Sequence, residues 1–127
     1  MALRLLDTSV AVDHLRGHRP ATTMLGELFD AEVAILGSEV VRFELLAGTR
    51  QTEEPAVDRF LKAVDWIPVT EAVTRQAAAY ARAYRGSHGG IDDADYLIAG
   101  TATVLGADLL TTNLRHFPMF EELARPY

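Results

Sequence analysis

Short runs of hydrophobic residues alternate along this chain with longer stretches in which apolar positions recur every three or four residues. The short runs favour buried strands, because they are only four or five residues long and are bounded by turn-forming or polar residues. We expect Gly37 to end the second strand. The predicted strands cover residues 2–6, 33–36, 66–69 and 108–111.

The longer stretches have the period of amphipathic helices. Residues that favour helix N-termini precede three of them, at Asp7 to Ser9, at Ser38 and at Thr70. Gly17 to Pro20 should break the first helix. The other predicted helices cover residues 20–31, 38–48, 53–64, 70–85 and 92–105, and the segment from residue 113 onward should hold short elements at best.

This order of elements predicts an α/β protein. We expect a three-layer α/β/α sandwich with a short-stranded, mainly parallel central sheet, and the length of 127 residues suits a single domain over residues 1–127. Ligands of such sheets bind beyond the carboxyl ends of the strands. Asp7 and the residues after Thr111 should lie at that edge.

Five carboxylates precede, follow or interrupt apolar runs, where a charge is unusual. A buried carboxylate without a counter-charge costs several kcal/mol. Mg²⁺ would stabilise a group of them, because this hard cation prefers carboxylate oxygen and keeps several waters for chemistry. The sequence therefore points to a metal-dependent active site if the fold brings these residues together. They are Asp7, Glu44, Asp92, Asp93 and Asp95.

Glu44 and Asp95 have the strongest case for a functional role. Glu44 projects into the apolar side of its helix, and the alternative is a surface glutamate paired with Arg42. Asp95 lies one turn into its helix, on the side where Ile98 and Ala102 should be buried. We favour both as metal ligands.

The remaining acids have simpler alternatives. Asp92 fits a helix N-cap and is also a candidate for supporting the metal ligands from outside the coordination sphere. Asp93 is explained as an ordinary charge in the first turn of a helix. Asp7 fits the N-cap of the first helix and a metal ligand equally well. His14 and His18 have the spacing of zinc ligands, but Gly17 breaks the helix between them, so surface histidines are expected.

Composition and charge narrow the classes of function. Hydrophobic residues make up 49% of the chain and no cysteine occurs, which excludes disulfides, thiol catalysis and zinc–thiolate sites. No apolar stretch is long enough for a membrane span, so a cytoplasmic protein is expected. The net charge of −6 argues against nucleic-acid binding. However, all basic residues except Lys62 are arginines, which suit bidentate phosphate contacts.

Four motifs occur in an order that resembles the PIN-domain ribonucleases, most closely the VapC-type toxins of bacterial toxin–antitoxin pairs. The resemblance covers essentially the whole chain and implies that the acids matching Asp7, Glu44 and Asp95 bind Mg²⁺ or Mn²⁺. It adds Asn113 to the catalytic residues, and many relatives carry Asp where His116 stands. The motifs are Asp7-Thr8-Ser9, Glu44 to Gly48, Asp95 to Ala99 and Thr111-Thr112-Asn113.

The resemblance implies a Mg²⁺-dependent endoribonuclease toxin that cleaves tRNA, rRNA or mRNA by a metal-activated water. It also implies a homodimer, and a small VapB-type antitoxin that places a basic residue in the acidic site and assembles with the toxin as a heterotetramer or larger. We expect residues 38–64 to form the dimer contact.

Two other classes of function compete with a nuclease. One is a catalytically inactive PIN-like module whose acidic pocket docks a basic partner. The other is a phosphoacceptor domain like those of response regulators, which needs an acid pair after the first strand and a lysine late in the chain. The single Asp7 and the early position of Lys62 make this last class a poor match.

Overall fold

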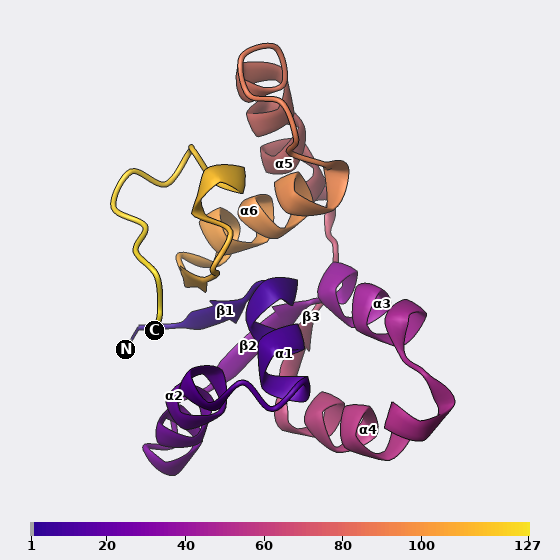
Figure 1. Cartoon of the computed structure of the whole chain (residues 1–127). Helices are drawn as coiled ribbons and strands as arrows, with labels where there is room; N and C mark the ends of the chain where they lie inside the picture. The colour runs from indigo at the N-terminus through magenta and orange to yellow at the C-terminus, as the bar shows by residue number, and fades with distance from the viewer. Residues whose placement is uncertain (1) are drawn as a thin grey trace.

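The computed structural model describes residues 2–127 and is built around a four-stranded sheet (Figure 1). The strand order is β3-β2-β1-β4, and each neighbouring pair is parallel. The predicted short-stranded parallel sheet is therefore confirmed. The strands are β1 (Arg4–Leu6), β2 (Ile35–Ser38), β3 (Asp65–Ile67) and β4 (Asp108–Leu110).

Helices connect the strands and cover the sheet, which confirms the predicted α/β/α sandwich. In the view of Figure 1, α5 and α6 pack together above the sheet, while α2 and α4 lie below it. The helices are α1 (Thr8–Leu15), α2 (Arg19–Asp30), α3 (Glu39–Gly48), α4 (Glu54–Ala63), α5 (Glu71–Tyr84) and α6 (Asp93–Leu105), with short 3-10 turns η1 (Gln51–Glu53) and η2 (Leu114–His116).

Local sequence signals explain most helix boundaries. The Ser38 hydroxyl accepts a hydrogen bond from the Val40 amide at 3.1 Å and caps α3, while Thr70 caps α5 in the same way. Gly17 follows α1 with a φ of +78°, a conformation that glycine adopts without strain. These caps and the break after α1 are as the sequence predicts.

The interior of the sheet contains one correction to the predicted elements. Gly37 was expected to end a strand, but it lies inside β2, in register with Trp66 of β3. A Cβ at Gly37 would lie 2.5 Å from the Trp66 ring. The glycine therefore makes room for a side chain of the neighbouring strand, which is a tertiary contact and not a turn signal.

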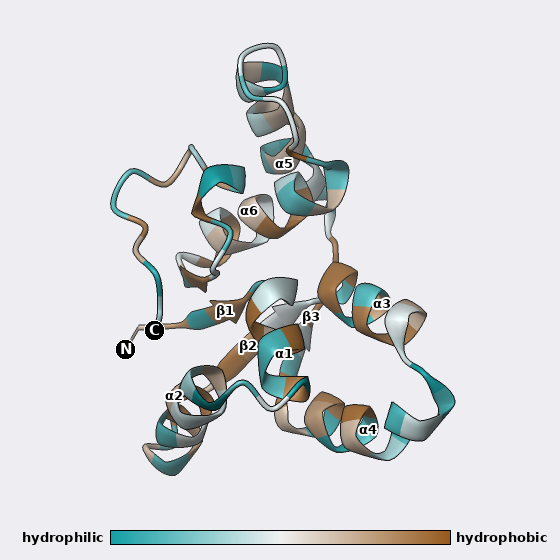
Figure 2. Cartoon of the chain, in the orientation of Figure 1, coloured by the Kyte–Doolittle hydropathy of each residue, from teal (hydrophilic) through white to brown (hydrophobic). Residues whose placement is uncertain are grey.

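The core lies between the sheet and its helices. Figure 2 shows hydrophobic residues along the strands and on the inward sides of the helices, with hydrophilic residues outside. Leu5 and Leu6 of β1 are fully buried, as expected for a parallel strand with helices on both faces. The helices contribute Val10, Leu25, Val41, Phe60 and Ile98 to the same core.

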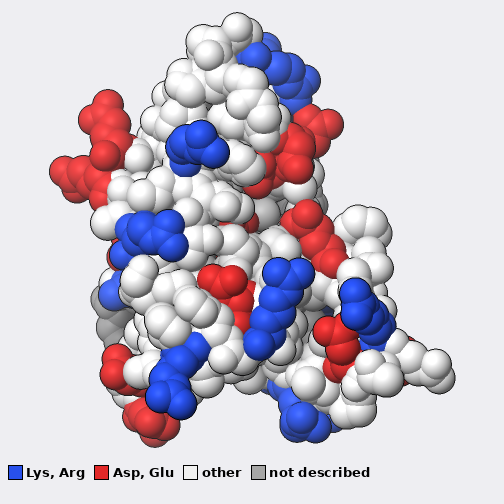
Figure 3. All heavy atoms as spheres, viewed as in Figure 1, with Lys and Arg blue, Asp and Glu red and all other residues white. Residues whose placement is uncertain are grey.

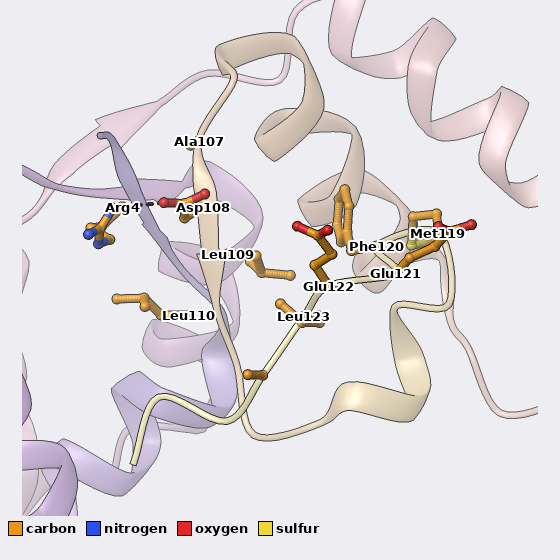
Figure 4. A pocket seen from close by; sticks show the side chains of 11 residues that line it. Arg4, Ala107, Asp108, Leu109, Leu110, Met119, Phe120, Glu121, Glu122 and Leu123 are labelled. Carbon is orange, nitrogen blue, oxygen red and sulfur yellow. Dashed lines mark hydrogen bonds and ion pairs between the residues drawn. The ribbon is translucent and has the colours of Figure 1, made fainter. Parts of the chain in front are cut away.

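The C-terminal segment passes beside β4, the edge strand (Figure 4). The two elements line a cavity of about 700 Å³, into which Leu109 of the strand and Phe120 and Leu123 of the segment contribute apolar side chains. Arg4 and Asp108 form an ion pair at 2.8 Å across β1 and β4. A covered edge is protected from pairing with another chain.

Within residues 2–127, no helix combines the length and the apolar character needed to cross a membrane.

Candidate functional site

The sheet order places the ends of β1 and β4 side by side. The chain leaves β1 to form β2 and β3 on one side of it, and returns to add β4 on the other side. The Asp7 amide, just beyond β1, donates a hydrogen bond to the Leu110 carbonyl of β4 at 2.9 Å. This reversal of strand order is where parallel α/β sheets bind ligands, as the sequence predicts for Asp7 and the residues after Thr111.

Asp7 is almost completely buried, with 2% of its surface exposed. Its Oδ2 accepts hydrogen bonds from the Thr111 hydroxyl at 2.6 Å and the Ser9 hydroxyl at 2.8 Å. Asp7 occupies the N-cap position of α1, yet its side chain makes no capping hydrogen bond. Asp7 therefore caps α1 by backbone position only, and its carboxylate faces the hydroxyls of Ser9 and Thr111; its role as a metal ligand stays a prediction.

Glu44 reaches the same region from α3. The Thr8 hydroxyl donates a hydrogen bond to its Oε1 at 2.7 Å. The alternative of a Glu44–Arg42 pair is wrong, because Arg42 pairs with Glu39 one turn earlier and lies over the Trp66 ring. The helix directs Glu44 toward Thr8 of α1, whereas Arg42 faces Trp66 of β3.

Asp95 lies in the first turn of α6, and its side chain is only 13% exposed. Its Oδ2 accepts a hydrogen bond from the Asp92 amide at 3.2 Å, while Asp92 Oδ1 accepts one from the Asp95 amide at 3.0 Å. Burial raises the pKa of Asp95 to about 6, and the negative charges of Asp92 and Asp7 act in the same direction. The Asp92 amide and His116 oppose this rise, and His116 Nδ1 lies 3.2 Å from Asp95 Oδ2.

A cavity of about 410 Å³ brings the predicted site residues together. The local charge is strongly negative, because one arginine, Arg16, and five carboxylates line the cavity, those of Asp7, Asp13, Glu44, Asp92 and Asp95. Asp93 does not line it: its side chain is 85% exposed and pairs with Arg85. The lining includes Asp7, Glu44, Asp92, Asp95, Asn113 and His116.

The donor set suits a hydrated divalent cation. In each of Asp7, Glu44 and Asp95, one carboxylate oxygen accepts a protein hydrogen bond, and within residues 2–127 the other oxygen takes part in no hydrogen bond or ion pair. No three acidic or histidine side chains in this part of the chain stand close enough to hold an ion by themselves. Mg²⁺ fits such a site, because it keeps several waters and needs only one or two direct carboxylate ligands.

The hydroxyl residues that orient these acids were expected only as helix-start and motif residues, and not as hydrogen-bond donors to the carboxylates. Ser9 and Thr111 hold Asp7, and Thr8 holds Glu44. The Ser9 hydroxyl also accepts a hydrogen bond from the Thr112 amide at 3.1 Å, which ties the first turn of α1 to the loop after β4. The available signal was the clustering of hydroxyl residues at the two strand ends, although the pattern does not say which oxygen each would bind.

The expectation of two surface histidines is wrong for His14. Its ring lies 5.1 Å from the Phe60 ring, its Nδ1 is buried without a hydrogen-bond partner among residues 2–127, and burial lowers its pKa. His18 is exposed, as expected. The break at Gly17 sends the two side chains into different surroundings.

Comparison with known proteins gives matches over nearly the whole chain. The PIN domain model matches residues 4–125. Ribonuclease VapC19 of Mycobacterium tuberculosis (strain ATCC 25618 / H37Rv) is 56% identical over 125 residues, covering 98% of this chain and 100% of that protein. Ribonuclease VapC10 of the same strain is 42% identical over 124 residues, covering 97% and 92%.

Solved structures share the fold. VapBC2 from Rickettsia felis, bound to a DNA fragment from its promoter, matches with a TM-score of 0.82 and 22% identity over 97% of this chain and 96% of that chain. A toxin–antitoxin complex from Klebsiella pneumoniae matches with a TM-score of 0.80 and 21% identity over 98% of both chains.

Proposed function

The chain belongs to the PIN-domain family, and on that premise we propose that it is a metal-dependent endoribonuclease, the toxin of a toxin–antitoxin pair. The observation that carries the proposal is the convergence of Asp7, Glu44 and Asp95, from three separate segments, on one acidic cavity at the reversal point of the sheet. The names of the two mycobacterial ribonucleases support the same activity.

The protein's part in the reaction is to orient carboxylate oxygens around the cavity. Asp7 and Asp95 would hold Mg²⁺ or Mn²⁺ through their free oxygens, and Glu44 would act directly or through water. When bound, such an ion lowers the pKa of a water molecule and stabilises charge on a phosphate. The hydroxyls of Ser9 and Thr111 keep Asp7 from rotating, and exposed Asn113 lies where its amide can contact the RNA backbone.

We propose single-stranded or unpaired RNA as the substrate. The major groove of an A-form duplex is too deep and narrow for side chains to read, whereas unpaired strands expose their bases fully. Figure 3 shows Lys and Arg interspersed with Asp and Glu on the face in view, without a large basic patch there. Affinity for long duplexes through charge alone is therefore not expected.

The proposed partners are a VapB-type antitoxin and a second copy of the chain. A neighbouring cavity of about 390 Å³ shares Glu44 with the acidic cavity and is lined by Leu15, Leu45 and Val57. An antitoxin segment lying there could place a basic residue among the acids. Phe43, on the outer side of α3, is 69% exposed, which supports a homodimer contact within residues 38–64.

The test is cleavage of total RNA by purified toxin without its antitoxin. We expect cleavage with Mg²⁺ or Mn²⁺, none with EDTA, and loss of activity in Asp7→Asn and in Asp95→Asn. Asp93→Asn is the matched control, because Asp93 is in the same helical turn as Asp95 but outside the cavity. It should cleave at nearly the wild-type rate.

Two outcomes would contradict the proposal. Activity that survives both Asp7→Asn and Asp95→Asn would show that the cavity is not the active site. Wild-type protein that binds a basic antitoxin segment but cleaves no RNA with either metal would favour the inactive binding module.

A further inference from the structure

We propose that His116 is a positioning residue of the metal site: through Nδ1 it holds Oδ2 of Asp95 and so presents Oδ1 to the cation. The inference rests on the proposed function, since it concerns the same cavity. Nothing in the family motif predicts this role, because many relatives have an acid at this position. An imidazole N–H can donate a hydrogen bond to a carboxylate, whereas an ionised acid has no donor.

The backbone around His116 is firmly placed. His116 ends the 3-10 turn η2, and its amide donates to the Asn113 carbonyl at 3.0 Å. The next residue, Phe117, is 1% exposed and stacks with Phe120, so it anchors the turn in the core. The imidazole therefore projects into the acidic cavity from a fixed point, with its side chain 36% exposed.

The contacts of Asp95 divide its two oxygens. Oδ2 accepts a hydrogen bond from the Asp92 amide at 3.2 Å and lies at ion-pair distance, 3.2 Å, from His116 Nδ1, whereas Oδ1 takes part in no hydrogen bond or ion pair within residues 2–127. Asp7 shows the same division, with both of its hydroxyl donors on Oδ2. Donors that hold one oxygen of a ligating carboxylate fix the direction of the other, which is how groups outside the coordination sphere strengthen metal binding.

The competing explanation is that His116 is itself a metal ligand through Nε2. The two roles use different ring nitrogens, so replacing His116 by Asn or by Gln distinguishes between them. The amide nitrogen of Asn lies two bonds beyond Cβ, as Nδ1 does, and that of Gln lies three bonds beyond Cβ, as Nε2 does. His116→Asn therefore keeps a donor near Asp95 and removes any ligand at Nε2.

The experiment is calorimetric titration of the antitoxin-free protein with Mn²⁺ alone, with thermal melting of each metal-free variant. We expect His116→Asn to bind Mn²⁺ nearly as tightly as the wild type, and His116→Gln and His116→Ala to bind roughly 10 to 100 times more weakly. All three variants should melt close to the wild type without metal, since the side chain is partly exposed.

A second measurement needs no metal. Imidazole ¹⁵N spectra of the metal-free protein should show a proton on His116 Nδ1, and Asp95→Asn should shift that signal. An unprotonated Nδ1 would overturn the proposal.

The outcomes separate this proposal from the proposed function. Failure of the wild-type protein to bind Mn²⁺ would refute the metal-dependent function and the role of His116 with it. If the wild type binds Mn²⁺, equal affinity in all variants would refute the role of His116 alone. Weakened binding in His116→Asn with the Nδ1 proton present would identify His116 as a direct ligand.

Discussion

Replacing Thr111 by valine tests how strongly the fold depends on orienting the buried Asp7. Thr111 has no exposed surface, and its hydroxyl donates to Asp7 Oδ2 at 2.6 Å. Valine keeps nearly the same shape but has no donor, so Asp7 would be left with Ser9 as its only hydroxyl partner. The Asn113 amide, which donates to the Thr111 hydroxyl at 3.0 Å, would lose its acceptor as well.

The expected loss of stability in Thr111→Val follows from the charge of the acceptor, the Asp7 carboxylate. A hydrogen bond to an ionised group contributes roughly 2 kcal/mol, and for a domain of this size that corresponds to a fall in Tm of about 8 °C. Water cannot replace the lost donor, because Asp7 is 2% exposed. The backbone amide of Asn113 belongs to an exposed residue, so water is a ready acceptor for it and its lost hydrogen bond should add little.

Thr101 is the matched control. It is equally buried, but its hydroxyl donates to the Leu97 carbonyl within α6 at 2.8 Å, so Thr101→Val leaves no charged group without a donor. The free energy of unfolding of Thr101→Val should fall by no more than about 1 kcal/mol. Urea denaturation followed by circular dichroism measures both, with unchanged m values as the sign of intact two-state unfolding.

A double variant identifies the source of the effect. In an Asp7→Asn background, Thr111→Val should lower stability by about half as much, because the amide oxygen is uncharged. If Thr111→Val is no more destabilising than Thr101→Val, or if its effect is the same in both backgrounds, the charge of Asp7 does not set the strength of this hydrogen bond.

The remaining predictions concern helix packing, a buried hydroxyl and an exposed apolar side chain. Gly100→Ala should lower the free energy of unfolding by about 1–3 kcal/mol, because the added Cβ would lie 2.8 Å from a backbone oxygen of α5. Gly26→Ala, at an open position of α2, should raise it by about 0.5–1 kcal/mol. Equal urea midpoints for the two variants would contradict this. Burial and a hydrogen bond to Asp13 raise the pKa of Tyr127 above its usual value of about 10, so its contribution to stability is complete below that pH and is lost as the pH rises above it. The wild-type Tm should therefore fall more steeply above pH 10 than that of Tyr127→Phe, and parallel curves would disprove the linkage. Phe43→Asp should convert the proposed homodimer to a monomer in light scattering with an unchanged circular dichroism spectrum, and a persistent dimer would place the contact away from Phe43.

The elements of the fold were predictable because their signals are local. Apolar runs and helical spacing located every strand and long helix to within a few residues, and Ser38, Thr70 and Asp92 start helices as their residue types predict. Gly37 was misjudged because its local signal, a glycine after an apolar run, also marks an end of a strand. The actual constraint is the Trp66 ring, which belongs to a strand almost thirty positions away.

The site was predictable in its residues and not in its contacts. An acid on the apolar side of a helix can be recognised from periodicity alone, which is why Glu44 and Asp95 were chosen and Asp93 was set aside. The catalytic assignment of these acids and of Asn113 stays a prediction for the cleavage assay. No local pattern distinguished His14 from a surface histidine, because its surroundings come from Phe60 of α4.

The order and type of the elements, and the acids at the strand and helix ends, follow from local patterns in the sequence. Which oxygen of each acid is held and which is free depends on how distant segments pack together. Asp7 illustrates the reason: its decisive partner, Thr111, lies 104 positions away and reaches it because β4 pairs with β1. Strand order depends on how all the apolar faces pack together, so a contact that depends on it is absent from any local stretch of sequence.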